Sequence, residues 1–318
     1  MERQAISHVR HHDAGNGCAV MSLAPSTLGF IGLGVMGAAE CLNLLRKSGT
    51  PTVVFDLNPD NIEPLVAAGA IPAESVAEVA ARADVMFLSL PGGTEVSAVL
   101  YDEGGILGAA RPGSLVIDLS TTPVAVAKAA HDRLAQRQLS FLDAPVARTR
   151  KAAVAGTLAI MVGGAESDYR RAEPLLRTMG TDVTHCGPGG AGALLKLVNN
   201  TVVFETVVAL AEAVTLARHS GLVTDETLFD VLGGGSAGSF VLENHGRSAL
   251  LPDQHPTGIF PAAYMRKDLG YTLELAAELG VELPSATLAH SMLDQLCDNG
   301  FAQNYHTAVV RLLDKDRK

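Results

Sequence analysis

The hydrophobic positions divide the chain into an N-terminal region of short apolar runs and a C-terminal region of helical periodicity. Up to about residue 163, the apolar runs alternate with helix-like stretches such as 36–48, 62–68 and 124–135. The runs that we predict as strands are 28–31, 52–55, 85–90, 115–119, 140–142 and 158–162. Strands that alternate with helices predict a parallel sheet wrapped by helices.

The pattern changes after the glycine-rich stretch 187–192. Helical periodicity then continues to the C-terminus with almost no strand signal, and the clearest helices are 193–219, ended by Gly221, and 269–279, ended by Gly280. We therefore predict an α/β domain over residues 27–188 and an all-α domain over residues 189–318. Residues 1–26 are expected to form a flexible leader, with Met21 as an alternative start, because residues 1–16 are polar and lack periodicity.

Composition and charge narrow the class of protein. The chain has 318 residues, 47% of them hydrophobic, and 34 acidic against 24 basic side chains give a net charge of −10, so nucleic acid is not an expected partner. Its four cysteines have neither CxxC nor metal-ligand spacing, which favours a reducing compartment and no metal site. No apolar run reaches the length of a membrane span, and 18–24 is too short for a signal peptide. We expect a cytoplasmic protein.

A glycine motif follows the first predicted strand and opens the first predicted helix. It has the GxGxxG pattern and consists of Gly32, Leu33, Gly34, Val35, Met36 and Gly37. Its glycines permit a tight turn and a close backbone approach to a pyrophosphate, which the helix N-terminus attracts. Asp56 ends the next strand, nineteen residues after Gly37, where a carboxylate would accept hydrogen bonds from ribose hydroxyls. No arginine follows at Leu57 or Asn58, so we predict a Rossmann-type domain that binds NAD rather than NADP. The alternative is an ordinary glycine turn with a surface Asp.

Further motifs follow in order, and together with the glycine motif they resemble the β-hydroxyacid dehydrogenase family, the group of 3-hydroxyisobutyrate dehydrogenase and tartronate semialdehyde reductase. The resemblance covers roughly residues 28–314. The motifs are Asp118-Leu119-Ser120-Thr121, Asp143-Ala144-Pro145-Val146 with Gly156-Thr157-Leu158, the stretch 192–200 with Lys196, and Lys267-Asp268-Leu269. The resemblance implies a Rossmann domain, a long interdomain helix and an all-α domain that forms homodimers or homotetramers. It also implies an active site in the cleft between the domains.

Lys196 is the candidate acid/base. Oxidation of an alcohol requires a proton acceptor, and a lysine serves if desolvation lowers its pKa, as the apolar neighbours of Lys196 would do. The residues alone favour a lysine that lies along a helix surface, which is the commoner role. The resemblance reverses this, because the family's catalytic lysine falls at this position. Asn200, one turn later, shares the face of Lys196 and is implied to hold the substrate and the lysine in register.

Other candidates follow strand ends or lie in the helical region. Ser120 and Thr121 follow the strand 115–119, at the edge where ligands bind in open α/β sheets. The resemblance implies that Ser120 contacts substrate and Thr121 contacts the cofactor, although both hydroxyls could instead cap the next helix. It also implies that Leu90 and Pro91 line the cofactor and that Lys267 closes over it. The alternative for Lys267 is a Lys-Asp pair on a surface helix.

One loop departs from the family pattern. After Val146 the family usually has Ser-Gly-Gly, whereas this chain has Ala147, Arg148 and Thr149, followed by Arg150. Because an arginine grips an oxyanion with two hydrogen bonds, we hypothesise that Arg148 binds a second anionic group on the substrate. A Gly-Arg-Thr variant of this loop occurs in sulfolactaldehyde reductase, a partial match only. The alternative is that Arg148 and Arg150 face solvent or a partner subunit. The candidate substrate-binding residues are Ser120, Ala147, Arg148, Thr149, Lys196 and Asn200.

These observations predict an oxidoreductase that interconverts a small anionic 3-hydroxy acid and its semialdehyde by hydride transfer to or from NAD. A sulfolactaldehyde-type reductase for a doubly anionic substrate and a non-catalytic NAD-binding sensor are the alternatives. Lys196 argues against an imine reductase, because related imine reductases lack the catalytic lysine. A 6-phosphogluconate dehydrogenase is longer and has a His where Asn199 stands.

Overall fold

The computed structural model describes residues 25–314, so most of the predicted leader lies outside the described residues. Within this range the N-terminal domain has one nine-stranded sheet, ordered β3-β2-β1-β4-β5-β6-β8-β7 with β9 paired to β8. The six strands in the spatial order β3-β2-β1-β4-β5-β6 pair in parallel, which is the order of a doubly wound dinucleotide-binding sheet. The strands are β1 (Leu28–Ile31), β2 (Thr52–Phe55), β3 (Ile71–Pro72), β4 (Val85–Leu88), β5 (Leu115–Asp118), β6 (Ser140–Asp143), β7 (Val146–Ala147), β8 (Leu158–Gly163) and β9 (Gly180–Gly187).

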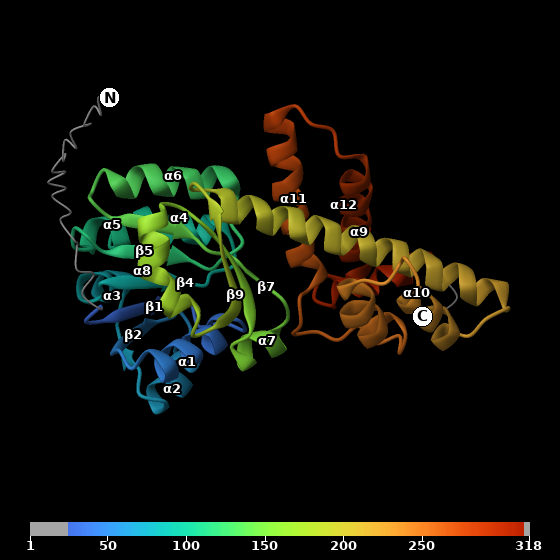
Figure 1. Cartoon of the computed structure of the whole chain (residues 1–318), viewed down its shortest axis with the longest axis horizontal. Coiled ribbons are helices and arrows are strands. Elements are labelled where there is room, and N and C mark those ends of the chain that lie inside the picture. The colour runs from blue at the N-terminus through green and yellow to red at the C-terminus, as the bar shows by residue number, and fades with distance from the viewer. Residues whose placement is uncertain (1–24, 315–318) are drawn as a thin grey trace, which may run out of the picture.

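Helices cover both faces of this sheet, as Figure 1 shows. The central strands are therefore buried on both sides, and their apolar side chains alternate between two cores. Phe30 and Phe87 stack on one face with ring centroids 5.9 Å apart, whereas Ile31 and Leu88 belong to the core on the other face. The helices are α1 (Gly37–Ser48), α2 (Pro59–Ala67), α3 (Val76–Arg82), α4 (Gly93–Tyr101), α5 (Ile106–Ala109), α6 (Val124–Ala135), α7 (Arg150–Ala155) and α8 (Glu166–Leu176).

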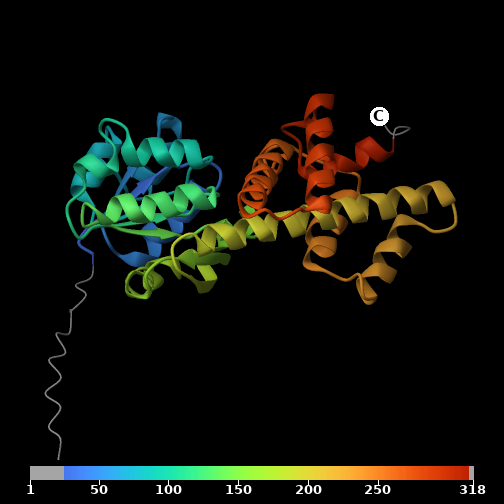
Figure 2. The same cartoon turned by 90° about the horizontal axis from the view of Figure 1, so that it is seen from above.

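The second domain is helical and is built on α9 (Ala191–Ser220), a helix of 30 residues. Figures 1 and 2 show α9 crossing from the sheet into the helical domain, where the other helices pack along it. Phe204, Leu269 and Leu293 belong to the shared core of this domain. The remaining elements are α10 (Asp225–Gly234), the π-helix η1 (Leu242–Leu250), α11 (Ala262–Leu279), α12 (Pro284–Leu296), the π-helix η2 (Cys297–Phe301), the 3-10 helix η3 (His306–Val309) and α13 (Val310–Leu313).

The predicted architecture, a Rossmann-type domain followed by a helical domain on a long helix, is confirmed, and the differences lie at the ends of elements. β4 ends at Leu88 and β5 at Asp118, so the residues that follow form loops at the carboxyl edge of the sheet. Three strands were not predicted. β3 and β7 have two residues each, and β9 carries polar side chains along half-exposed positions. α11 begins at Ala262, before the predicted position 269. The sequence pattern missed its first turns because Arg266, Lys267 and Asp268 interrupt the apolar periodicity there.

The expectation that no segment reaches the length of a membrane span needs correction. By length and composition α9 is long and apolar enough to cross a membrane. In sequence its apolar run is broken by Lys196, Glu205 and Glu212, which is why the pattern did not show it. We interpret α9 as the core helix of the helical domain, because one side of it, including Phe204, is buried against the other helices.

The start of α9 is anchored by Asp143, at the end of β6. The Asp143 carboxylate is 1% exposed and accepts hydrogen bonds from the backbone N–H groups of Gly190 and Ala193, each at 2.8 Å. His131 Nε2 lies 2.9 Å from the same carboxylate. A Cβ at Gly192 would collide with the backbone carbonyls of Met161 and Asp143, so the helix docks backbone against backbone. The position of α9 relative to the sheet therefore depends on this carboxylate.

We expect Asp143→Asn to lower the free energy of unfolding by about 2 kcal/mol, because an amide has no net charge to place at the positive end of the helix dipole and one oxygen to accept with. Urea denaturation followed by circular dichroism measures this. Asp102→Asn removes the same charge at an exposed position and should stay within about 0.5 kcal/mol of wild type. Equal unfolding midpoints for the two variants would contradict the anchoring role of Asp143.

Candidate active site

The glycine motif lies between β1 and α1 at the carboxyl edge of the sheet. Gly32 has a φ of 91°, and a Cβ there would collide with the Ser89 carbonyl. A Cβ on Gly37 would collide with the Gly32 carbonyl. Gly34 differs, because no described heavy atom lies within 4 Å of the position its Cβ would take. The first and third glycines are thus required by close backbone packing, and the second leaves space beside the helix N-terminus.

The N-terminus of α1 is suited to an anion. Its N-cap residue, Met36, makes no side-chain capping hydrogen bond in the described structure. The N–H groups of Ala38, Ala39 and Glu40 donate to the backbone carbonyls of Gly34 and Met36, so the N–H groups left for an anion are those of residues 34–37. Unpaired N–H groups at a helix N-terminus attract phosphate. Together with the space at Gly34, this fits the pyrophosphate of a dinucleotide.

Asp56 braces the same loop. Its Oδ2 accepts a hydrogen bond from the Leu33 N–H at 2.6 Å, and its Oδ1 accepts from the Asn58 N–H at 2.8 Å and from the Asn61 side chain at 3.1 Å. The carboxylate is thus held beside the glycine loop by three N–H groups. Carboxylate oxygens have capacity for further donors, such as ribose hydroxyls.

The loop after β5 is organised by Asp118, which is 1% exposed. Its carboxylate accepts hydrogen bonds from the Ser120 N–H at 2.9 Å and the Thr122 hydroxyl at 2.8 Å. Burial raises the pKa of Asp118 to about 6, against the opposing effect of these hydrogen bonds. The Ser120 hydroxyl accepts from the Leu90 N–H at 2.9 Å, which joins the loops after β4 and β5. Neither Ser120 nor Thr121 caps α6, whose N-cap residue is Pro123.

Lys196 and Asn200 lie on the face of α9 that meets α11, and both are buried, at 9% and 4% exposure. Asn200 Nδ2 donates to Asp268 Oδ2 at 2.7 Å, and its Oδ1 accepts from Asn199 at 3.0 Å. Burial lowers the pKa of Lys196, the nearby Asp268 carboxylate opposes this, and the Lys267 charge adds to it. The arrangement is a desolvated amine beside an oriented amide, not a lysine extended along the helix surface.

Lys267 connects the two domains. Its Nζ lies 2.9 Å from Asp268 Oδ1 and 3.4 Å from the Thr121 carbonyl oxygen, and 5.0 Å from the Tyr271 ring centroid. A Cβ at Gly92 would come within 3.0 Å of the Tyr271 hydroxyl, so α11 packs against the loop that contains Pro91. Lys267 therefore stands where the helical domain meets the carboxyl edge of the sheet.

Arg148 points elsewhere. It has a left-handed backbone conformation, with a φ of 86°, and its guanidinium donates to the Thr157 carbonyl at 2.6 Å, the Thr181 hydroxyl at 3.1 Å and Asp182 at 2.5 Å. Ala147 lies on β7, and Thr149 is the N-cap residue of α7 without a side-chain cap. In this structure the charge of Arg148 is paired with Asp182, so a role in substrate binding would require the side chain to leave that pair.

Two acidic residues were missed as members of the site. Asp268 holds Asn200 and faces Lys196, and Asp118 holds the Ser120 loop. Both belong to motifs that the sequence displays, but a charged residue in a motif does not reveal its burial. Among residues 25–314, no group of three or more His, Cys, Asp or Glu side chains could hold a metal ion.

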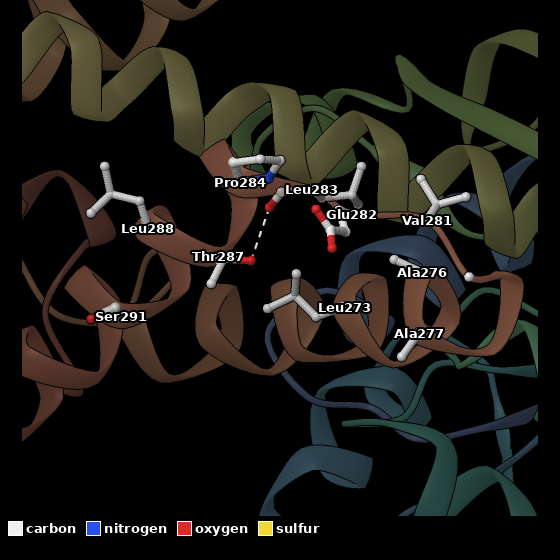
Figure 3. Close-up of a pocket in the computed structure, with 11 residues that line it drawn as sticks. Leu273, Ala276, Ala277, Val281, Glu282, Leu283, Pro284, Thr287, Leu288 and Ser291 are labelled. Atoms are coloured by element: carbon white, nitrogen blue, oxygen red, sulfur yellow. Dashed lines mark hydrogen bonds between the residues drawn. The ribbon is translucent and has the colours of Figure 1, made fainter.

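A separate cavity of about 950 Å³ lies at the turn between α11 and α12 (Figure 3). Its walls are mainly apolar and include Leu273, Val281, Leu283 and Leu288. None of the residues that line it belongs to the constellation around Lys196. The candidate site at the interface of the two domains is therefore separate from this cavity.

The chain is similar to known oxidoreductases over most of its length. Residues 27–187 match the family model described as the NAD binding domain of 6-phosphogluconate dehydrogenase, and residues 190–313 match that described as NAD-binding of NADP-dependent 3-hydroxyisobutyrate dehydrogenase. A probable mitochondrial 3-hydroxyisobutyrate dehydrogenase of Dictyostelium discoideum is 36% identical, over 92% of each chain. An NAD-dependent L-serine dehydrogenase of Pseudomonas aeruginosa is also 36% identical, over 90% of this chain and 97% of the relative.

A solved structure agrees with these relatives. The structure of Mycobacterium tuberculosis 3-hydroxyisobutyrate dehydrogenase with L-serine has a TM-score of 0.83 and 35% identity, and the match covers 91% of this chain and 99% of that one. The similarity extends through both domains, including the segments that carry the glycine motif and Lys196.

The different surroundings of two glycines give a paired prediction. We expect Gly37→Ala to lower the free energy of unfolding by about 1–3 kcal/mol, because its methyl group would overlap the Gly32 carbonyl. Gly34→Ala should leave stability nearly unchanged but weaken NADH binding about tenfold or more, because its methyl group enters the space for the cofactor. Thermal unfolding and fluorescence titration with NADH measure both effects. Tight NADH binding by Gly34→Ala would be inconsistent with this placement of the cofactor.

Proposed function

Because the chain belongs to the β-hydroxyacid dehydrogenase family of oxidoreductases, we propose that it interconverts a small 3-hydroxy acid and its semialdehyde, with NAD as the hydride carrier and Lys196 as the acid/base. The observation that carries this proposal is the burial of Lys196 beside Asn200 and Asp268 at the domain interface. NAD supplies the hydride acceptor in oxidation, and its reduced form supplies the donor in the reverse direction.

The residues around Lys196 support proton transfer in either direction. Burial favours the neutral amine, which can accept the proton of the alcohol as the substrate is oxidised. The Asp268 carboxylate favours the ammonium form, which can donate a proton to the carbonyl oxygen during reduction. The two effects oppose each other, and the net result is a pKa of Lys196 below the usual value for lysine.

Asn200 and Ser120 are proposed to hold the substrate. One N–H of the Asn200 amide is engaged by Asp268, and an amide carries two N–H groups, so the second is available to a substrate oxygen. Ser120 is fixed by the Leu90 N–H at the edge of the sheet. The domain interface thereby offers a proton carrier and two polar groups from separate elements to a small, anionic substrate.

The preference for NAD rests on Asp56. Its carboxylate would repel the 2′-phosphate of NADP, and the following residues, Leu57 and Asn58, provide no cation to offset this. The family model that matches residues 190–313 is described for NADP-dependent enzymes, so the test compares both cofactors.

The relatives narrow the substrate class. Their names specify 3-hydroxyisobutyrate and L-serine, which both carry a hydroxyl group on the carbon next to the α-carbon of a small carboxylic acid. A doubly anionic hydroxy acid, or a sulfonate such as sulfolactaldehyde, is a second candidate, favoured by Arg148. Its pair with Asp182 is exposed, and exposed pairs are worth about 1 kcal/mol or less, so a substrate anion could displace it.

We also propose that the protein forms a cytoplasmic homodimer or homotetramer. The first half of α9 carries a row of exposed apolar side chains: Leu194, Leu195, Val198 and Val202. A second copy of the chain that covers this row would remove it from water.

We expect Lys196→Ala to lower kcat by about a hundredfold or more, because the acid/base is lost, while NADH binding remains. The assay follows NADH at 340 nm with a panel of semialdehydes that includes methylmalonate, tartronate and succinate semialdehydes and sulfolactaldehyde. In the oxidation direction, wild-type kcat/KM should rise with pH through a pKa below the usual value for lysine, because the neutral amine is the active form. Lys196→Arg keeps a cation that does not deprotonate, and it should be as inactive as Lys196→Ala.

An active Lys196→Ala variant would refute the assignment of the acid/base. Binding of NADH without turnover of any panel member would favour a non-catalytic sensor.

The cofactor preference has its own test. We expect kcat/KM with NADH to exceed that with NADPH by about tenfold or more, because a 2′-phosphate beside Asp56 would place two anions together. Asp56→Asn should narrow the ratio by improving use of NADPH. A higher kcat/KM with NADPH in the wild-type enzyme would overturn the preference.

A further inference from the structure

A buried carboxyl group lies beneath the glycine motif and has no part in the proposed chemistry. Glu40, in the first turn of α1, is 0% exposed. Neither of its carboxyl oxygens makes a hydrogen bond of normal geometry with the described residues, and the Ser89 side chain is the polar group close enough to act on them. Buried charges in proteins are usually paired, because an unpaired buried charge is costly. Burial raises the pKa of Glu40 to about 7, and the Ser89 hydroxyl opposes this effect.

The position of Glu40 places it close to the cofactor loop. It is one helical turn beyond Gly37, which packs against the Gly32 carbonyl. A Cβ placed on Gly37 would lie 3.0 Å from the Ser89 Cβ. The Ser89 side chain, directly after β4, acts on the buried Glu40 carboxyl group, so this group lies between the first turn of α1 and the end of β4. A negative charge here weakens the attraction of the α1 N-terminus for an anion.

Few other charges act on Glu40. The adjacent Cys41 thiol is buried too, and its pKa is raised by burial and by the charge of Glu40. The strands beneath, β1 and β4, carry apolar side chains and one glycine. The helices α2, α7 and α8 pack on α1. The charged side chains of α8 lie at or near the surface, and those of α2 and α7 are exposed: Asp60, Glu63, Arg150 and Lys151. The Ser89 hydroxyl is thus the polar neighbour that bears on this carboxyl group.

We propose that Glu40 couples cofactor binding to protonation, because its neutral carboxyl group permits the pyrophosphate above it and its carboxylate repels that group. The proposal rests on the glycine motif as the pyrophosphate site, and it does not depend on the substrate. Cofactor binding then takes up a proton at neutral pH, and affinity falls as pH rises. If binding raises the pKa of Glu40 by one unit, Kd increases tenfold between the protonated and ionised limits.

Isothermal titration calorimetry of NADH binding tests this without substrate, from about pH 5.5 to about pH 9 and in two buffers of different ionisation enthalpy. For the wild-type protein we expect a Kd that rises about tenfold across this range and a net proton uptake that is largest near neutral pH. Glu40→Gln keeps the shape of the side chain without its charge, and its Kd should change little with pH. Glu63→Gln, which removes a charge at an exposed position of α2, should behave like wild type.

The stability of the cofactor-free protein gives a second readout. A buried acid with a raised pKa stabilises the fold while it is protonated, and this contribution is lost as pH rises from about 4.5 to about 7. Glu40→Gln should therefore have a higher Tm than wild type at about pH 8, and the difference should shrink at about pH 5. A Tm difference that does not change with pH would count against the ionisation of Glu40.

Absence of proton uptake in the wild-type protein, or the same pH dependence in Glu40→Gln, would overturn the proposal. Failure of NADH to bind at any pH would overturn the cofactor site and this proposal with it. NADH binding whose pH dependence disappears in Glu40→Gln, in a protein without turnover, would support this proposal. It would contradict only the proposed substrate chemistry.

Discussion

The structure depends on one carboxylate at one helix end. Asp143, at the end of β6, accepts hydrogen bonds from Gly190 and Ala193 and so holds the N-terminus of α9 against the sheet. α9 carries Lys196 and forms the core of the helical domain, so this contact sets the position of Lys196 relative to the sheet. A buried anion at a helix N-terminus is a favourable way to fix such a junction, because the partial positive charges of the helix stabilise the carboxylate.

Four acidic side chains lie at or under the carboxyl edge of the sheet. They differ in the groups that donate hydrogen bonds to them, and this difference separates their roles. Asp56 accepts a hydrogen bond from one N–H of the glycine loop, Asp118 from the Ser120 loop and Asp143 from the start of α9. Glu40 is the exception within the described structure, since its oxygens make no hydrogen bond of normal geometry. Three of the carboxylates thus organise loops at the carboxyl edge of the sheet, and the fourth is the group that we propose responds to protonation.

The surroundings of Lys196 exert opposed electrostatic effects on its amine. Burial alone would keep Lys196 neutral, and a fully paired lysine would stay charged. Asp268 is shared with Asn200 and Lys267, so its charge acts on Lys196 without a direct ion pair to it in the described contacts. The same carboxylate accepts a hydrogen bond from the Asn200 amide and so orients it.

The sequence by itself determined six of the nine strands, the glycine loop with Asp56, and the placement of Lys196 and Asn200 on one helical face, because these depend on local periodicity and spacing. Resemblance to a known family supplied the role of Lys196, which periodicity could not. Only the tertiary structure decided which charges are buried: Asp118, Asp268 and Glu40 look like surface residues in sequence, and Arg148 pairs with Asp182, thirty-four residues away. The cause is physical, because desolvation and long-range pairing depend on elements that meet only when the two domains pack together.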